Sequence, residues 1–177
     1  GFEPVVIDVP AADGAVAVGL TTCYDVRFPD LHLELAERGA QLLTVHASWG
    51  SGPGKLDQWT LLARARALDT GCFVAAVDQP YPGDELAKKG PTGNGGSLVA
   101  SPTGDIVEQA GLDPELLVID VDLAAVERAR ETIAVLRNRI AIPRKAQSQG
   151  RLTPGPAPPM RTLHHPPSLP CRRPRIR

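Results

Sequence analysis

The chain has 177 residues, of which 42% are hydrophobic, and a formal net charge of −1. This content suffices for one folded core, which must be mostly aliphatic because only 4% of the residues are aromatic. The sequence has no run of about 20 apolar residues, which excludes a membrane-spanning helix, and its three irregularly spaced cysteines exclude a disulfide framework and favour the reducing cytoplasm.

The charge divides the chain near residue 140. Residues 1–140 hold all 20 acidic residues and 11 Lys and Arg, giving 11 − 20 = −9, whereas residues 141–177 hold 8 Lys and Arg and no acid. The second segment also lacks apolar periodicity, so we expect a folded domain over 1–140 and a disordered Pro/Arg-rich tail over 141–177. A basic arm for nucleic acid is the alternative. No aromatic residue lies among the arginines to stack on bases, so no nucleic-acid partner is expected.

The first domain alternates strands and helices, which predicts an α/β fold. Asp30 is expected to act as the N-cap of a helix, and Gly71 to end a longer one. In chain order the expected elements are a hairpin over 4–9 and 15–21, a helix over 31–38, a strand over 41–45, a helix over 56–70, a strand over 72–77, a loop over 78–95, a hairpin over 97–100 and 106–109, a strand over 116–121 and a helix over 123–130.

Cys23 lies where the strand over 15–21 ends and a polar turn begins, directly before a helix. A cysteine in that place is exposed at the edge of a sheet, with backbone N–H groups directed at the same point. This arrangement suits a nucleophile with part of an oxyanion site. The alternative is an inert buried cysteine, since cysteine is among the most commonly buried residues.

Residues 23–29, Cys-Tyr-Asp-Val-Arg-Phe-Pro, resemble the nucleophile motif of the nitrilase superfamily of carbon–nitrogen hydrolases. Further similar segments follow in the order of that family. They are 38–43 (RGAQLL), 47–49 (ASW), 59–73 (WTLLARARALDTGCF), 95–99 (GGSLV) with 102–104 (PTG), and 134–137 (AVLR). The similarity covers residues 1–140, and the motif is most similar to that of the amide-cleaving branches.

The resemblance implies a partial α-β-β-α sandwich and a hydrolase that needs neither a metal nor an organic cofactor. Its substrate would be a small amide or nitrile, with an amide preferred. The thiolate attacks the carbon, a thioester forms as ammonia or an amine leaves, and water releases the acid. A homo-oligomer is expected on the same ground, and the lack of a long apolar run predicts no membrane partner.

The resemblance also assigns roles within the motif. Cys23 is the nucleophile, and the backbone N–H of Tyr24 helps to hold the oxyanion. Asp25 and Arg27 are expected to brace the turn through ion pairs rather than to touch the substrate.

Residues farther along the chain are given supporting roles. Ser48 and Trp49 are expected to border the substrate pocket, with core packing as the alternative for Trp49. Arg64 and Arg66 are expected to tie the long helix to neighbouring acids, and Cys72 is expected to lie in the core.

The family activates its cysteine with a glutamate base and a lysine that precede it by long stretches. Only 22 residues precede Cys23. They include the acids Glu3, Asp8 and Asp13 but no lysine. We therefore expect a truncated chain, the C-terminal part of such an enzyme, with an exposed apolar sheet face. The alternative is a non-catalytic fragment that dimerises or binds. A dyad of Cys23 with His46 would be another way to activate the thiol, although a lone histidine at a strand end is more often a surface residue.

Overall fold

The computed structural model describes residues 3–12, 14–90 and 92–140, and the chain divides into two units, residues 1–140 and 141–177. The expected tail therefore lies outside the described residues. The elements are β1 (Val5–Ala11), β2 (Gly14–Thr22), the 3-10 helix η1 (Cys23–Arg27), α1 (Pro29–Glu37), β3 (Leu42–Ala47), α2 (Lys55–Thr70), β4 (Phe73–Asp78), α3 (Asp84–Ala87), β5 (Leu98–Ala100), β6 (Ile106–Gln109), α4 (Ala124–Ile133) and α5 (Val135–Asn138). Within these ranges, no helix is both long and apolar enough to cross a membrane.

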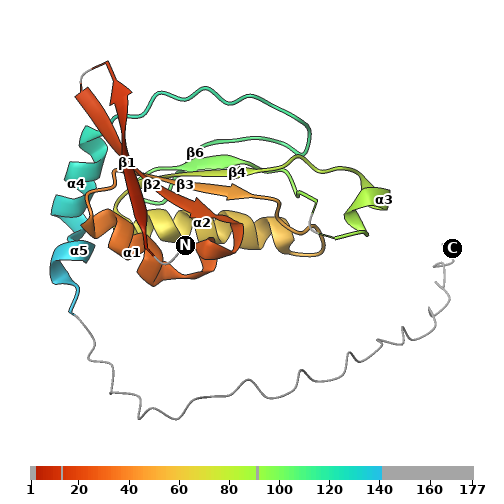
Figure 1. Ribbon diagram of the computed structural model, residues 1–177, viewed down its shortest axis with the longest axis horizontal. Coiled ribbons are helices and arrows are strands. Elements are labelled where there is room, and N and C mark those ends of the chain that lie inside the picture. The colour runs from red at the N-terminus through yellow and green to blue at the C-terminus, as the bar shows by residue number, and fades with distance from the viewer. Residues whose placement is uncertain (1–2, 13, 91, 141–177) are drawn as a thin grey trace, which may run out of the picture. The chain divides into compact units, whose positions relative to one another are not determined.

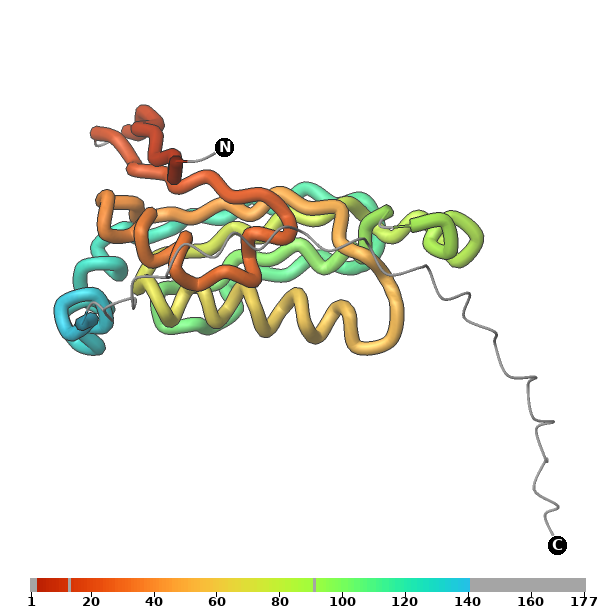
Figure 2. The backbone as a smooth tube through the Cα atoms, turned by 60° about the horizontal axis from the view of Figure 1, so that its bottom comes forward, coloured from red at the N-terminus to blue at the C-terminus, as the bar shows by residue number. Residues whose placement is uncertain are grey.

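The strands form one mixed sheet in the order β1 to β6 (Figure 1). The central strands β2, β3 and β4 run parallel, whereas β1 pairs antiparallel with β2, and β5 pairs antiparallel with both β4 and β6. Both predicted hairpins are confirmed, as β1–β2 and β5–β6. The start of β2, which pairs with β1 alone, extends beyond the other strands (Figure 2).

Two helices, α1 and α2, connect the parallel strands and cover one face of the sheet (Figures 1 and 2). The α/β fold expected from the alternating pattern is thereby confirmed. Small residues on α2 allow close packing, and Gly71 ends the helix with φ +62°, as its position predicted. The fully buried side chains of this layer include Leu35, Leu43, Val45, Trp59, Ala63, Val74 and Leu98.

The opposite face of the sheet, here called the open face, carries the alternate residues of the same strands. Its apolar side chains are partly uncovered: Val5, Ile7, Leu20 and Val77 are between 38% and 48% exposed, whereas Val18 and Phe73 are buried. The expected exposed apolar face is therefore present within the described residues.

An extended segment over residues 112–123 crosses part of the open face (Figure 1). A hollow of about 390 Å³ lies between it and the sheet, lined by Leu42, Ala75, Val99 and neighbouring residues. The prediction of a strand over 116–121 is wrong, because these residues pair with no strand of the described sheet. Its alternating pattern has another cause: the residues at 117, 119 and 121 are half-buried, while Leu116 and Val118 are 85% exposed.

The structure also corrects the start of α1 and adds three short helices. The helix begins at Pro29, whose fixed φ suits the first helical position, so Asp30 lies in the first turn and is not the cap. The short helices η1, α3 and α5 were not predicted; α3 lies inside the expected loop over 78–95, and α5 lies beyond the expected helix over 123–130.

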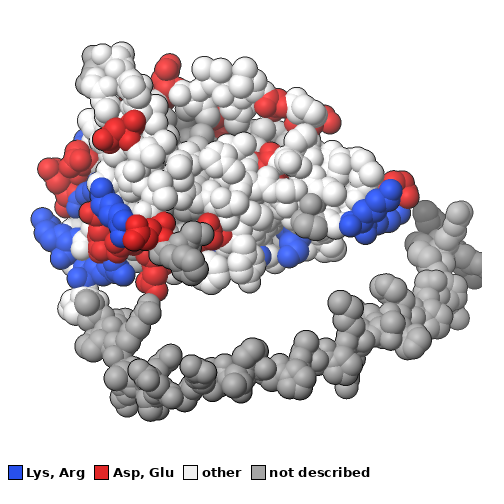
Figure 3. All heavy atoms as spheres, viewed as in Figure 1, with Lys and Arg blue, Asp and Glu red and all other residues white. Residues whose placement is uncertain are grey.

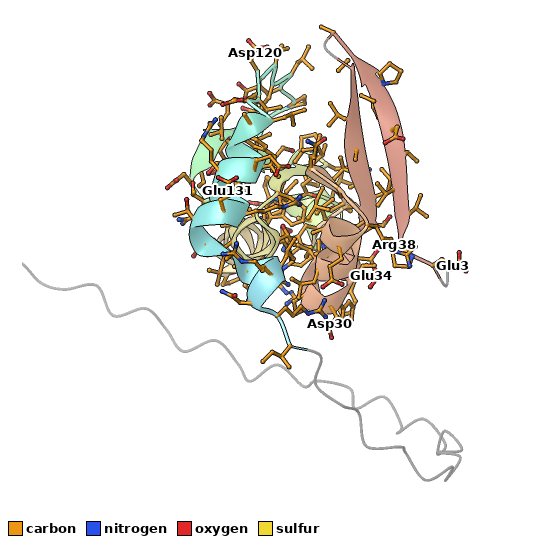
Figure 4. All side chains as sticks on the ribbon, turned by 90° about the vertical axis from the view of Figure 1, so that its left-hand side faces the viewer. Glu3, Asp30, Glu34, Arg38, Asp120 and Glu131 are labelled. Carbon is orange, nitrogen blue, oxygen red and sulfur yellow. The ribbon has the colours of Figure 1, made fainter. Side chains whose placement is uncertain are left out.

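Charged side chains gather at the end of the unit that contains α1, α4 and α5 (Figure 3). There Arg38 forms an ion pair with Glu34 (2.8 Å) and donates a hydrogen bond to the carbonyl of Pro4 (3.2 Å) (Figure 4). The end of α1 is thus tied to the start of β1.

Candidate active site

The parallel strands β2, β3 and β4 all end at one edge of the sheet. The register places Thr22 beside His46 and Ala47 beside Asp78. Cys23, Ser48 and Trp49 follow the first two of these strands directly, so they meet at this edge. In α/β sheets, ligands commonly bind outside the carboxyl ends of parallel strands.

Cys23 opens a sharp turn at this edge. It begins η1 with φ +44°, in the left-handed region that non-glycine residues enter at a cost of about 1–2 kcal/mol. The Asp25 carboxylate accepts a hydrogen bond from Thr22 N–H (2.9 Å), and the Asp25 carbonyl accepts one from Phe28 N–H (2.9 Å). Val26 points into the core and is fully buried. The turn is therefore anchored from inside while the Cys23 side chain stays half-buried.

The neighbouring aromatic side chain is directed to solvent. Tyr24 is 63% exposed and packs edge-to-face on Phe28, with ring centroids 5.5 Å apart. The predicted contribution of Tyr24 is its backbone N–H, which follows Cys23 directly in the turn. An exposed ring is compatible with that role.

Asp25 and Arg27 were expected to form ion pairs, but within the described residues neither does. The expectation of ion pairs is therefore wrong. The tight turn directs the Asp25 carboxylate back to the N–H of Thr22. Arg27 instead extends over the ring of Trp49, at 4.9 Å from its centroid, and donates to the side-chain oxygen of Gln58 (3.3 Å).

Trp49 lies in the core as well as at the edge of the sheet. Its side chain is buried against Trp59, with centroids 5.3 Å apart, and its indole N–H donates to the carbonyl of Lys55 (3.1 Å). Ser48 beside it is half-buried, and its hydroxyl donates to the side-chain oxygen of Gln79 (3.4 Å). Contact of either residue with substrate stays a prediction.

Asp78 is a buried carboxylate at the same edge that the sequence reasoning missed. One of its oxygens accepts a hydrogen bond from Trp49 N–H (2.7 Å), and the other accepts one from Asn94 N–H (2.8 Å). Burial raises the pKa of Asp78 above its ordinary value, while these backbone N–H groups act in the opposite direction. Asp78 therefore joins the loop after β3 to the glycine-rich loop before β5. An acid that ends an apolar strand is the signal that could have identified it.

Two arginines of α2 were expected to pair with acids, and one of them does. Arg66 pairs with Asp69 at 2.7 Å, as expected for a residue tied to an acid. Arg64 donates to the carbonyl of Gly104 (2.6 Å) and forms no ion pair within the described residues, so an acid partner was the wrong expectation. Cys72 is fully buried, as predicted, and its thiol donates to the carbonyl of Ala40 (3.1 Å).

A hollow of about 560 Å³ lies beside the turn and opens between β1, β2 and α1. Polar groups of Thr22, Asp25 and His46 line it, together with the carboxylate of Glu3. None of its lining residues is a lysine. His46 is exposed, and within the described residues no hydrogen bond joins it to Cys23. The structure therefore does not show the dyad, which stays a prediction.

Comparison with known sequences gives two kinds of match. A sequence model of the carbon–nitrogen hydrolases matches residues 2–131. A protein of Mycobacterium tuberculosis that is named as a hydrolase is 60% identical over 157 residues, which are 85% of this chain and 55% of that protein. The human deaminated glutathione amidase is 35% identical over 133 residues, which are 75% of this chain and 39% of that enzyme. The chain thus spans about half the length, or less, of these relatives.

Solved structures match the same part of the chain. Saccharomyces cerevisiae Nit3, a member of branch 10 of the nitrilase superfamily, superposes with a TM-score of 0.65 at 29% identity, over 75% of this chain and 46% of Nit3. A variant of the amidase from Nesterenkonia sp. superposes with a TM-score of 0.56 at 29% identity, over 76% of this chain and 47% of the amidase. That structure shows covalent addition of the acetamide moiety of fluoroacetamide at the active-site cysteine of the amidase.

Proposed function

This chain belongs to the carbon–nitrogen hydrolase family of the nitrilase superfamily, and on that premise we propose that Cys23 is the nucleophile of a site that cleaves small amides. The observation that carries the proposal is the position of Cys23, on a sharp turn with φ +44° at the carboxyl end of a parallel strand. The adduct at the cysteine of the Nesterenkonia amidase supports the same chemistry.

The proposed reaction has two halves. In the first, the Cys23 thiolate attacks the amide carbon, and the backbone N–H of Tyr24 donates to the oxyanion that forms. The carbon–nitrogen bond breaks, the amine leaves with a proton, and a thioester remains on Cys23. In the second half, water attacks the thioester, its OH stays on the acid that departs, and its other proton restores the thiol.

The amide branch is favoured over the nitrile branch. The human relative is an amidase named for deaminated glutathione, and the Nesterenkonia neighbour is an amidase as well. Both support an amide carbon as the point of attack.

A free thiol is largely protonated at neutral pH, so the reaction needs a base. The hollow beside the turn offers the carboxylates of Glu3 and Asp25 but no lysine. We place the glutamate base and the lysine of the resemblance in sequence beyond these 177 residues, which span 39% to 55% of the length of the relatives. The open face is then the surface on which the second sheet of an α-β-β-α sandwich packs, because it is apolar and partly uncovered.

A panel of small amides, assayed for release of ammonia or amine, tests this function. The assay uses the protein as its native cell produces it. Three forms are compared: the wild type, Cys23→Ala and Cys72→Ala. We expect Cys23→Ala to lower kcat by about 10³-fold or more, and Cys72→Ala to leave it within a few-fold. Turnover that persists in Cys23→Ala would overturn the assignment. Absence of turnover from every form would favour the alternative, a non-catalytic fragment that binds or dimerises.

A further inference from the structure

The turn that carries Cys23 presents backbone carbonyls to the inside of the protein. A short 3-10 helix leaves the carbonyls of its last residues without partners inside the helix. Val26 belongs to this group and is fully buried, so its carbonyl must be satisfied by a donor from elsewhere. That donor is Arg66 of α2, whose Nη1 lies 2.9 Å from the Val26 oxygen.

Arg66 is itself held firmly in place. Its side chain is 9% exposed, and its Nη2 forms an ion pair with Asp69 at 2.7 Å, one turn farther along α2. A buried guanidinium is expensive to desolvate, and this one directs a charge-assisted hydrogen bond at the nucleophile turn. Because α2 packs against the sheet as the longest helix of the described residues, it offers the turn a rigid support.

A second buried donor holds the exit of the same turn. His32 of α1 is fully buried, and its Nδ1 lies 3.0 Å from the carbonyl of Phe28; since a carbonyl only accepts, Nδ1 carries the proton. The turn is therefore fixed at Val26 by one helix and at Phe28 by another. This double support accounts for a non-glycine residue, Cys23, that persists at φ +44°.

Arg64 provides a contrast within the same helix. Two residues before Arg66, it also donates to a backbone carbonyl, that of Gly104 at 2.6 Å, but this carbonyl belongs to the β5–β6 turn. The two arginines thus make similar bonds from one helix to two different loops.

We propose that Arg66 is a positioning residue for Cys23: through the carbonyl of Val26 it sets the turn that holds the thiol and the Tyr24 N–H in one geometry. The proposal rests on the proposed role of Cys23 as the nucleophile. It adds a function for a buried residue that lies on another helix and touches neither the substrate nor the reacting atoms. Asp69 contributes by holding the guanidinium of Arg66.

The test measures the turn directly and needs no turnover. Hydrogen exchange by mass spectrometry follows the peptide over 20–30, and the rate of alkylation by iodoacetamide follows the Cys23 thiol, in a Cys171→Ser background. The variants are Arg66→Met, Arg66→Lys and, as the matched control, Arg64→Met. Protection of Cys72, which is fully buried, reports in each sample that the fold is intact.

We expect Arg66→Met to speed exchange in the 20–30 peptide by about 10-fold or more and to change the alkylation rate of Cys23. Arg66→Lys, which keeps a cationic donor, should restore most of both values, and Arg64→Met should change neither. Equal behaviour of Arg66→Met and Arg64→Met in the 20–30 peptide would overturn the proposal. A loss of exchange protection in Arg66→Met that persists in Arg66→Lys would also overturn it.

If Arg66→Met exposes Cys72 and so proves unfolded, Asp69→Asn replaces it, because Asp69 is 38% exposed and its substitution leaves no cavity in the core. Exchange in the 20–30 peptide must then rise while Cys72 stays protected, and an unchanged peptide contradicts the proposal. In an active form of the protein, Arg66→Lys should lower kcat more than it changes KM. Retained turnover in Cys23→Ala would refute the proposed function alone, since the exchange and alkylation results report on the turn independently.

Discussion

At the scale of single residues, Asp78 connects two loops at the edge where Cys23 lies. Its two oxygens accept hydrogen bonds from Trp49 N–H and Asn94 N–H. In Asp78→Asn, an amide NH₂ would face one of these N–H groups, which would then be buried without a partner. We expect the variant to lower the free energy of unfolding by roughly 1–3 kcal/mol, measured by urea denaturation. Asp84→Asn, an exposed acid that accepts from the Tyr81 hydroxyl, is the control and should change it by less than about 0.5 kcal/mol.

His32 makes the stability of the turn depend on pH. Burial lowers the pKa of His32 below its ordinary value of 6.5, although the hydrogen bond to Phe28 opposes this shift. The unfolded chain therefore binds the proton at a higher pH than the folded chain. The stabilisation from this group is complete above about pH 6.5 and is lost as the pH falls from there toward the folded pKa.

Urea denaturation between pH 5 and pH 8 measures this effect. His32→Asn, whose side-chain amide can still donate to Phe28, should flatten the decline in the free energy of unfolding below pH 6.5. His46→Gln, which replaces an exposed histidine, is the control and should leave the decline as it is in the wild type. An equal decline in wild type and His32→Asn would contradict this account.

Residue identities predicted some of these contacts and not others. Cys23 was singled out because it lies between a strand and a polar turn, and because residues 23–29 resemble the nucleophile motif of the nitrilase superfamily. The bond from Arg66 to Val26 spans 40 positions, and the contact of Asp78 with Asn94 spans 16. Such contacts depend on which strand ends the sheet brings together, and no local pattern in the sequence contains that information.

At the scale of elements, the packing of β2 against α1 and β3 leaves no space at Gly19. A Cβ atom there would lie 2.7 Å from Leu43 Cδ2, 3.2 Å from the Cβ of Leu35 and 3.3 Å from that of Ala40. We expect Gly19→Ala to lower the free energy of unfolding by about 1–3 kcal/mol, because the buried neighbours must shift. In Gly111→Ala, a new Cβ would meet nothing within 4 Å, so this control should be nearly neutral. Equal melting temperatures for the two variants would show that β2 has room to move.

The pattern of apolar residues predicted elements well where a helix or strand buries one face. The helix α2 and the paired strands follow from such patterns, whereas α1 was predicted from its good helix formers, its expected cap and Gly39, because Leu31, Leu33 and Leu35 alternate as in a strand. It failed at residues 116–121, because a segment that lies flat across a sheet alternates in the same way as a strand that pairs within it. The helix η1 was missed for the opposite reason: five residues are too few to show a period.

At the scale of the whole unit, the two faces of the sheet differ in what covers them. Val77 on the open face is 48% exposed, whereas Val74 on the same strand is fully buried under α2. In the 177-residue chain, Val77→Lys should change the free energy of unfolding by less than about 0.5 kcal/mol, and Val74→Lys should abolish folding because it buries an unpaired charge. Circular dichroism with thermal melting measures both. Marked destabilisation by Val77→Lys would mean that the open face is covered in this chain.

The most direct test of the central claim, that Cys23 forms a thioester with an amide substrate, is mass spectrometry of the protein quenched during turnover. The protein, in the form that the cell makes, is mixed with small amides and stopped in acid, and its peptides are mapped before and after treatment with hydroxylamine. We predict an acyl group on the peptide that contains Cys23, removed by hydroxylamine, and none on the peptide that contains Cys72. An acyl group on another residue, or turnover of amides without any acylation of Cys23, would contradict the account.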